Sequence, residues 1–125
     1  MKYTISIDHE LRIIRYRHSG IIHAEDIEDA WGEFLNMPDF TQKEYKLLSD
    51  YRDGKFQMKL SDLSGVIGFM REIENIVKGK KQALIVDNPY SVATSILFKN
   101  KVYKEIGFIV KAFSTEPAAL KWLID

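Results

Sequence analysis

The order in which the hydrophobic period changes along the chain constrains the fold more than any other feature. Residues 2–8 and 11–18 alternate apolar and polar side chains, which is typical of two half-buried strands joined as an antiparallel hairpin. From residue 24 onward, segments with the period of an amphipathic helix alternate with short, mostly apolar runs typical of strands. The sequence therefore predicts an α/β domain with the element order β-β-α-β-α-β-α-β-α.

Each predicted helix has an apolar stripe and a residue type that ends it. Proline removes a backbone donor, and glycine adopts the left-handed conformation found after helices. Ser61 or Asp62 is expected to cap the second helix and Ser91 the third. The expected helices are 24–36 before Pro38, 61–78 before Gly79, 91–105 before Gly107, and a last helix after Ser114 or Thr115 with Pro117 in its first turn.

The remaining strands are expected at residues 45–50, 82–86 and 108–113. Ser19-Gly20 is expected to break or bulge the second strand, and Asp53-Gly54 is interpreted as a turn. Because each crossover after the hairpin carries a helix, we expect a mixed, mostly parallel sheet of about five strands covered by helices.

Composition limits the classes of function. The 125 residues are about the length of one domain, which we place at 1–125. The absence of cysteine excludes thiol catalysis and thiolate metal sites and fits a cytoplasmic protein. Equal numbers of basic and acidic residues, 18 of each, argue against nucleic acid as a partner. No apolar stretch predicts a membrane span, while peripheral membrane contact stays open.

Four local patterns resemble one known family. They are the segment 20–26 after the opening strand pair, 35–40 after the first helix, 62–66 at the start of the second helix, and the tail 110–123. Together with the element order, they resemble the SpoIIAA-like or STAS-like family, whose relatives include Sec14-type lipid-binding domains. This resemblance implies a SpoIIAA-like fold, with small apolar ligands or protein partners as the expected interactions.

One known mechanism of that family fits only in part. In its sigma-factor-regulating members, a serine in an Asp-Ser-Ser-Gly loop at the start of the second helix is phosphorylated as a switch. Here the corresponding residues are Asp62-Leu63-Ser64-Gly65, so Leu63 takes the place of the phosphorylated serine. Only Ser64 is left as a candidate for a phospho-switch.

Polar residues after two predicted strands suggest a binding site. In open α/β sheets, ligands favour the crevice outside the carboxyl ends of the parallel strands. Ordinary turn and capping chemistry explains the same residues fully and is the interpretation we prefer. The candidate crevice residues are Asp50, Tyr51, Arg52, Asp87, Asn88 and Tyr90.

The sequence contains no recognisable catalytic or cofactor motif. His9, His18 and His23 lack the spacing of a metal site, and we expect no metal and no cofactor. Phe56, Met58 and Leu60 fall in a long connection, where they could cover an apolar pocket.

Three functional hypotheses follow from these observations. We favour a non-enzymatic, regulatory STAS-like module that binds a protein partner or a second copy of itself. The first alternative is a carrier or sensor of a small apolar or lipid-like ligand. The second is a hydrolase using Asp50, Asp87 or a histidine.

Overall fold

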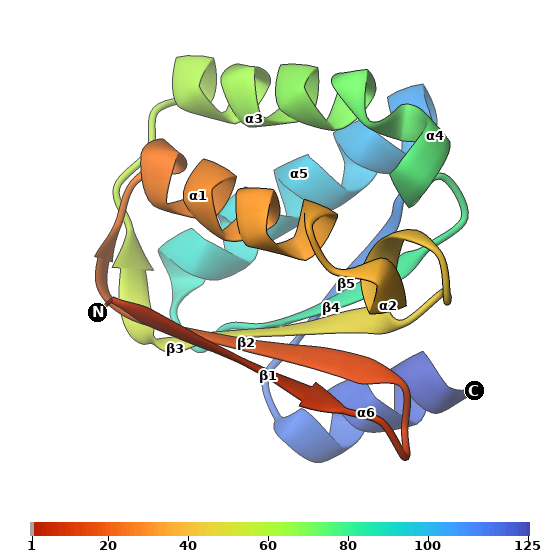
Figure 1. The fold of residues 1–125 in the computed structure, drawn as a ribbon. Helices are drawn as coiled ribbons and strands as arrows, with labels where there is room; N and C mark the ends of the chain where they lie inside the picture. Colours follow the sequence, from red (N-terminus) through yellow and green to blue (C-terminus); the bar gives the residue numbers. More distant parts are fainter. Residues whose placement is uncertain (1) are drawn as a thin grey trace.

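A five-stranded sheet forms the middle layer of the protein (Figure 1). The computed structural model describes residues 2–125. The strands lie in chain order across the sheet, and the first pair is antiparallel while the others are parallel. The predicted hairpin and the mostly parallel sheet are confirmed. The strands are β1 (Tyr3–Asp8), β2 (Ile13–Ile22), β3 (Lys46–Phe56), β4 (Lys81–Ile85) and β5 (Ile109–Phe113).

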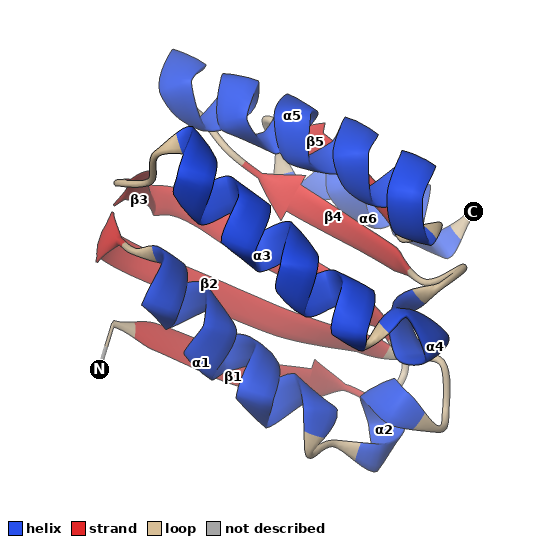
Figure 2. Ribbon diagram, turned by 90° about the horizontal axis from the view of Figure 1, so that it is seen from above, coloured by secondary structure: helices blue, strands red, loops and turns tan. Residues whose placement is uncertain are grey.

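Helices cover the two faces of the sheet unequally. Figure 2 shows α1, α3 and α5 side by side over one face, while α6 lies under the other. None of the helices within residues 2–125 has the length and apolar character needed to cross a membrane. The helices are α1 (Ala24–Leu35), α2 (Pro38–Thr41), α3 (Leu60–Glu72), α4 (Glu74–Val77), α5 (Pro89–Ile106) and α6 (Glu116–Ile124).

The alternation of side chains along β2 divides the interior into two cores. Ile14 and Tyr16 point into the larger core under α1, α3 and α5, whereas Ile13 points into the smaller core against α6. Trp31 and Phe34 on α1 contribute large aromatic rings to the larger core. The larger core therefore lies between the sheet and the three helices α1, α3 and α5.

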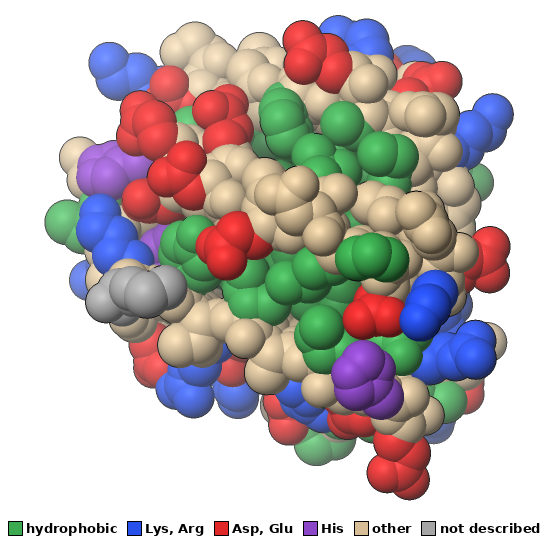
Figure 3. Space-filling view, viewed as in Figure 1, with side chains coloured by type: hydrophobic (Ala, Val, Ile, Leu, Met, Phe, Trp, Pro, Cys, Tyr) green, Lys and Arg blue, Asp and Glu red, His purple; other side chains and the backbone are tan. Residues whose placement is uncertain are grey.

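Helix α1 begins as the sequence predicts. Its acidic first turn includes Asp26, whose carboxylate accepts a hydrogen bond of 2.9 Å from the backbone N–H of His23. Negative charge at this end stabilises the helix through its dipole. Figure 3 shows acidic side chains gathered over α1, consistent with the exposure of Glu25, Glu28 and Asp29.

Strand β3 differs most from the prediction. The interpretation of Asp53-Gly54 as a turn is wrong, because β3 continues to Phe56 beside the end of β2. Between the pairs Arg17–Asp50 and Ser19–Asp53, β3 advances one residue more than β2, which makes a β-bulge. Ser19-Gly20 on β2 lies beside the bulge, and β2 itself runs on to Ile22.

Glycine at position 54 is required by a close approach to β2. A Cβ atom there would lie 2.5 Å from Cδ1 of the buried Ile22 and 3.2 Å from the carbonyl oxygen of Gly20. We expect Gly54→Ala to lower the free energy of unfolding by about 1–3 kcal/mol in urea titrations. Gly32→Ala on α1 is the matched control, because its added methyl group meets no described atom within 4 Å. The control should stabilise the helix by about 0.5–1 kcal/mol, and equal effects of the two variants would contradict this account.

Three expectations about the helices also need correction. The predicted helix 61–78 is interrupted at Ile73, where α3 ends and α4 begins. Ser91 does not cap α5, because Asn88 accepts the hydrogen bond from the Ser91 backbone N–H at 2.9 Å and the helix begins at Pro89. The helical period of segment 91–105 also predicts buried positions for Val92, Ile96, Leu97 and Tyr103, but these side chains of α5 are exposed.

Candidate functional site

The predicted crevice residues on β3 lie on opposite faces of the sheet. Asp50 accepts hydrogen bonds of 3.0 and 2.7 Å from the guanidinium group of Arg52 on the side of α6. Burial opposes the charged form of Asp50, but the hydrogen bonds from Arg52 outweigh it and lower the pKa of this carboxyl group. Tyr51 points into the helix-covered side and is buried.

The other predicted residues lie at the start of α5 and on α3. Asn88 caps α5, Asp87 is exposed, and the Tyr90 hydroxyl group donates a hydrogen bond of 2.6 Å to the carbonyl oxygen of Met58. Ser64 is exposed on α3, where its hydroxyl group donates to the carbonyl oxygen of Leu60 at 3.2 Å. The structure thus brings Tyr51 and Tyr90 toward the same region, while Asp50 and Arg52 lie across the sheet from it.

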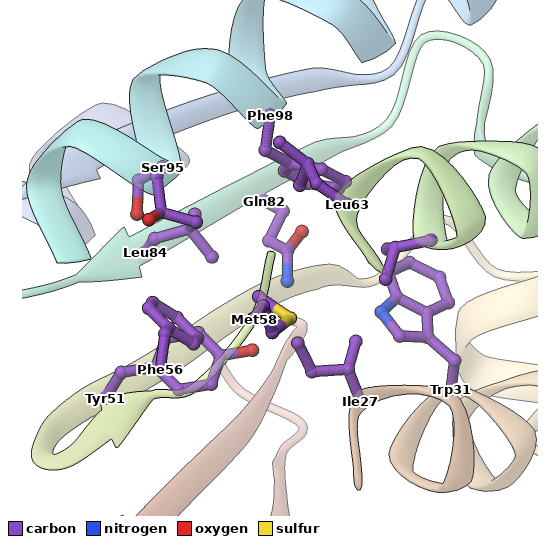
Figure 4. A pocket seen from close by; sticks show the side chains of 12 residues that line it. Ile27, Trp31, Tyr51, Phe56, Met58, Leu63, Gln82, Leu84, Ser95 and Phe98 are labelled. Atoms are coloured by element: carbon purple, nitrogen blue, oxygen red, sulfur yellow. The ribbon is translucent and has the colours of Figure 1, made fainter. Parts of the chain in front are cut away.

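A small apolar cavity lies between the sheet and the three covering helices (Figure 4). We call it the inner cavity, and its volume is about 40 Å³. This exceeds the roughly 10–15 Å³ needed for one water molecule. None of the described residues that line it is charged. Its apolar walls include Ile27, Trp31, Leu63, Val66, Leu84 and Phe98.

The bulge in β3 shapes one wall of the inner cavity. Tyr51 and Phe56 are five residues apart, so a regular strand would place them on opposite faces. The extra residue in the bulge turns both rings to the helix-covered side, where their centroids are 4.9 Å apart. Burial raises the pKa of Tyr51, so its hydroxyl group stays protonated at neutral pH.

Two buried polar side chains on the inner cavity have unsatisfied atoms. Gln82 on β4 donates a hydrogen bond of 2.9 Å from Nε2 to Oγ of Ser49, but its Oε1 has no partner among residues 2–125. Oγ of Ser95 on α5 also lacks a partner within the described part of the chain. Both side chains are only 2% exposed. Buried polar groups are nearly always hydrogen-bonded, so these two atoms are candidate partners for a further molecule.

A second depression adjoins the inner cavity. We call it the outer groove, with a volume of about 270 Å³. Met58, Leu63 and Thr94 line both spaces. The other residues of the outer groove are Lys59, Leu60, Tyr90, Ala93 and Leu97.

The sequence predicted only some of the residues that line these two spaces. Phe56 and Met58 were expected to cover an apolar pocket, and they line the inner cavity; however, Phe56 belongs to β3 instead of a long loop. Gln82 and Ser95 were missed. A signal existed for Gln82, because it is a polar residue at the start of an otherwise apolar strand segment. Ser95 gave no comparable signal, since serine is common on the exposed faces of helices.

His18 lies in a separate aromatic cluster beneath α1. It is fully buried, and its ring centroid lies 5.8 Å from that of Tyr3 and 5.7 Å from that of Tyr16. Nδ1 is hydrogen-bonded to the Tyr16 hydroxyl group, while Nε2 has no partner among the described residues. Burial lowers the pKa of His18, because the charged form loses hydration.

The lowered pKa of His18 predicts a pH dependence of stability. Below the ordinary histidine pKa of about 6.5, His18 takes up a proton in the unfolded chain but not in the folded protein. The free energy of unfolding should therefore fall as the pH decreases toward the folded-state pKa. Urea unfolding between pH 7.5 and 5.0 should show this decrease. His18→Phe should reduce its slope, whatever it does to stability at pH 7.5. An unchanged slope in this variant would contradict the assignment.

The described residues, 2 to 125, contain no group of three or more histidines and carboxylates arranged to hold a metal ion. The polar side chains that line the inner cavity carry amide and hydroxyl groups.

Comparisons with known proteins show the fold of the chain. No protein-family model matches the sequence, and no curated protein does so. One similar solved structure is that of an uncharacterized protein from the DUF3478 family with a SpoIIAA-like fold from Shewanella loihica PV-4. It is 15% identical in sequence, with a TM-score of 0.65, and the match covers 97% of this chain and 93% of that one. At this identity, the similarity establishes architecture alone. The chain has a SpoIIAA-like fold, as the resemblance in its sequence implied.

Proposed function

We propose that this protein is a non-catalytic binding module whose inner cavity takes the uncharged, hydrogen-bonding end of a small, mainly apolar molecule. The observation that carries this proposal is the pair of unpaired buried atoms, Gln82 Oε1 and Ser95 Oγ, on an otherwise apolar cavity. Gln82 Oε1 accepts a hydrogen bond, and the Ser95 hydroxyl group both donates and accepts. A hydroxyl or primary amide group has the donor and the acceptor that these atoms lack.

The absence of charged residues among the described lining of the inner cavity favours an uncharged ligand. A carboxylate or ammonium group placed there would lose its hydration without meeting an opposite charge among the described lining residues. An uncharged group loses less hydration and regains hydrogen bonds from Gln82 and Ser95. The protein is therefore expected to prefer alcohols or amides over acids and amines of the same length.

The chemistry of the lining residues favours binding over catalysis. The amide of Gln82 and the hydroxyl group of Ser95 are poor general bases near neutral pH. Tyr51, the titratable side chain on the described walls, is kept in its protonated form by burial. These groups are suited to orient a ligand in a fixed pose.

The proposal is tested by titrating the protein with 1-propanol in an NMR experiment. The volume of the inner cavity, a few times that of one water molecule, suits a probe of about four heavy atoms. We expect saturable shifts of the Gln82 side-chain amide and the Ser95 backbone amide. Propionate at pH 7 is the matched charged probe and should leave these signals unchanged. Equal responses to both probes, or none to 1-propanol, would contradict the proposal.

A second candidate function is self-association through α5. Val92, Ile96 and Tyr103 lie on its outer side and are 37%, 47% and 63% exposed. Such apolar exposure on one helix is typical of a contact surface. Sedimentation at increasing concentration should then show a dimer that Ile96→Asp converts to a monomer. A wild-type protein that remains monomeric at all concentrations would remove this candidate.

A further inference from the structure

The inner cavity and the outer groove adjoin one another. Met58, Leu63 and Thr94 line both spaces. The inner cavity has room for only a few heavy atoms, whereas the outer groove is several times larger. A molecule that is longer than a few atoms and has its polar end at Gln82 and Ser95 can extend past the shared side chains into the outer groove.

Met58 is the side chain suited to open that passage. It lies in the short connection between β3 and α3, and Figure 4 shows it at the cavity beside Ile27 and Gln82. Methionine is unbranched and has three rotatable bonds, so it can change rotamer without movement of the backbone. The backbone around it is held at three points: Gln57 N–H to the Ile22 carbonyl oxygen, the Tyr90 hydroxyl group to the Met58 carbonyl oxygen, and Lys59 N–H to Asp62.

Large apolar side chains that do not belong to the core line the outer groove. Leu60 is 73% exposed, and Tyr90 and Leu97 are about half exposed, although all three line the same groove. Large apolar side chains gathered at a concave surface mark a binding surface for an apolar group. Lys59 supplies the single charge among the described lining residues of the groove, and the other lining side chains are uncharged.

From this geometry we propose, on the basis of the function proposed above, that the ligand is an uncharged single-chain amphiphile. Its hydroxyl or amide end binds Gln82 and Ser95 in the inner cavity. Its chain passes Met58, which rotates to admit it, and its tail lies in the outer groove against Leu60 and Leu97. Recognition then combines a fixed polar end with a chain that gains affinity with length.

The experiment compares 1-propanol with 1-octanol by NMR titration of methyl-labelled protein. Both alcohols should shift the signals of Ser95 and Gln82, but only 1-octanol should shift the methyl groups of Leu60 and Leu97. Because each buried methylene group strengthens apolar binding by about fourfold and the groove is open, 1-octanol should bind at least roughly tenfold more tightly. Leu97→Asp should lower the affinity for 1-octanol by a similar factor and leave the affinity for 1-propanol unchanged.

A blocking variant tests the use of the outer groove. Ala93→Phe places a ring in the outer groove at a residue outside the described lining of the inner cavity, so it should abolish the chain-length dependence while preserving the response to 1-propanol. If both alcohols bind with equal affinity and the Leu60 and Leu97 signals stay fixed, the elongated site is wrong although the cavity still binds. If neither alcohol shifts Ser95 or Gln82, the proposed function itself fails.

Discussion

Replacing Phe34 with alanine is expected to lower the free energy of unfolding by about 3–5 kcal/mol, the range for large core truncations. Phe34 is 1% exposed on α1, and its ring centroid lies 5.4 Å from that of Trp31 and 5.8 Å from that of Tyr16. The substitution removes a buried ring and leaves a void between α1 and the sheet. Urea unfolding followed by circular dichroism measures the loss.

Leu60→Ala is the control for the Phe34 variant. Leu60 is a large apolar residue like Phe34, but it is mostly exposed in the outer groove. Its truncation should change the free energy of unfolding by less than about 0.5 kcal/mol. A loss below 1 kcal/mol for Phe34→Ala would show that α1 does not pack against the sheet as the structure has it.

Ser95→Ala is expected to raise stability and weaken binding at the same time. The Ser95 hydroxyl group is buried and has no partner among residues 2–125, and alanine is the better helix former. We expect a gain of about 1 kcal/mol in the free energy of unfolding. Loss of the hydrogen bond between Ser95 and the alcohol should lower the affinity for 1-octanol by about 3- to 10-fold. Thermal unfolding and calorimetric titration measure the two effects.

Ser91→Ala separates the two effects of the Ser95 variant. Ser91 lies one turn earlier on α5, and its hydroxyl group is also buried without a partner in the described chain. It does not belong to the described lining of the inner cavity. Ser91→Ala should therefore gain stability while leaving the affinity for 1-octanol unchanged. Similar losses of affinity in both variants would show that the effect of Ser95 is indirect.

The element order and the sheet could be predicted because the hydrophobic period is a local signal. Alternation in residues 2–8 and 11–18 identified the hairpin, and the glycines at 79 and 107 ended their segments as expected. The true length of β3 could not be predicted in the same way. Asp53-Gly54 has the composition of a turn, and only the neighbouring end of β2, with Ile22 against Gly54, holds it as a strand.

The candidate site was harder to predict than the fold because its residues come together from distant elements. Tyr51 reaches the inner cavity and Tyr90 reaches the outer groove. Asp50 and Arg52 instead bind each other on the opposite face of the sheet. The unpaired state of Gln82 and Ser95 depends on what surrounds them in space, which residue order does not reveal. The α5 surface was expected in the core, since helical periodicity cannot show which sides of a long helix are covered.

The most direct test of the binding site is a crystal structure of the protein soaked in 1-octanol. Our account predicts the alcohol oxygen within hydrogen-bond distance of Gln82 Oε1 and Ser95 Oγ. The chain should pass a rotated Met58 and continue along Leu60 and Leu97 in the outer groove. Ordered water at both polar atoms, with 1-octanol absent or bound only elsewhere on the surface, would contradict the account.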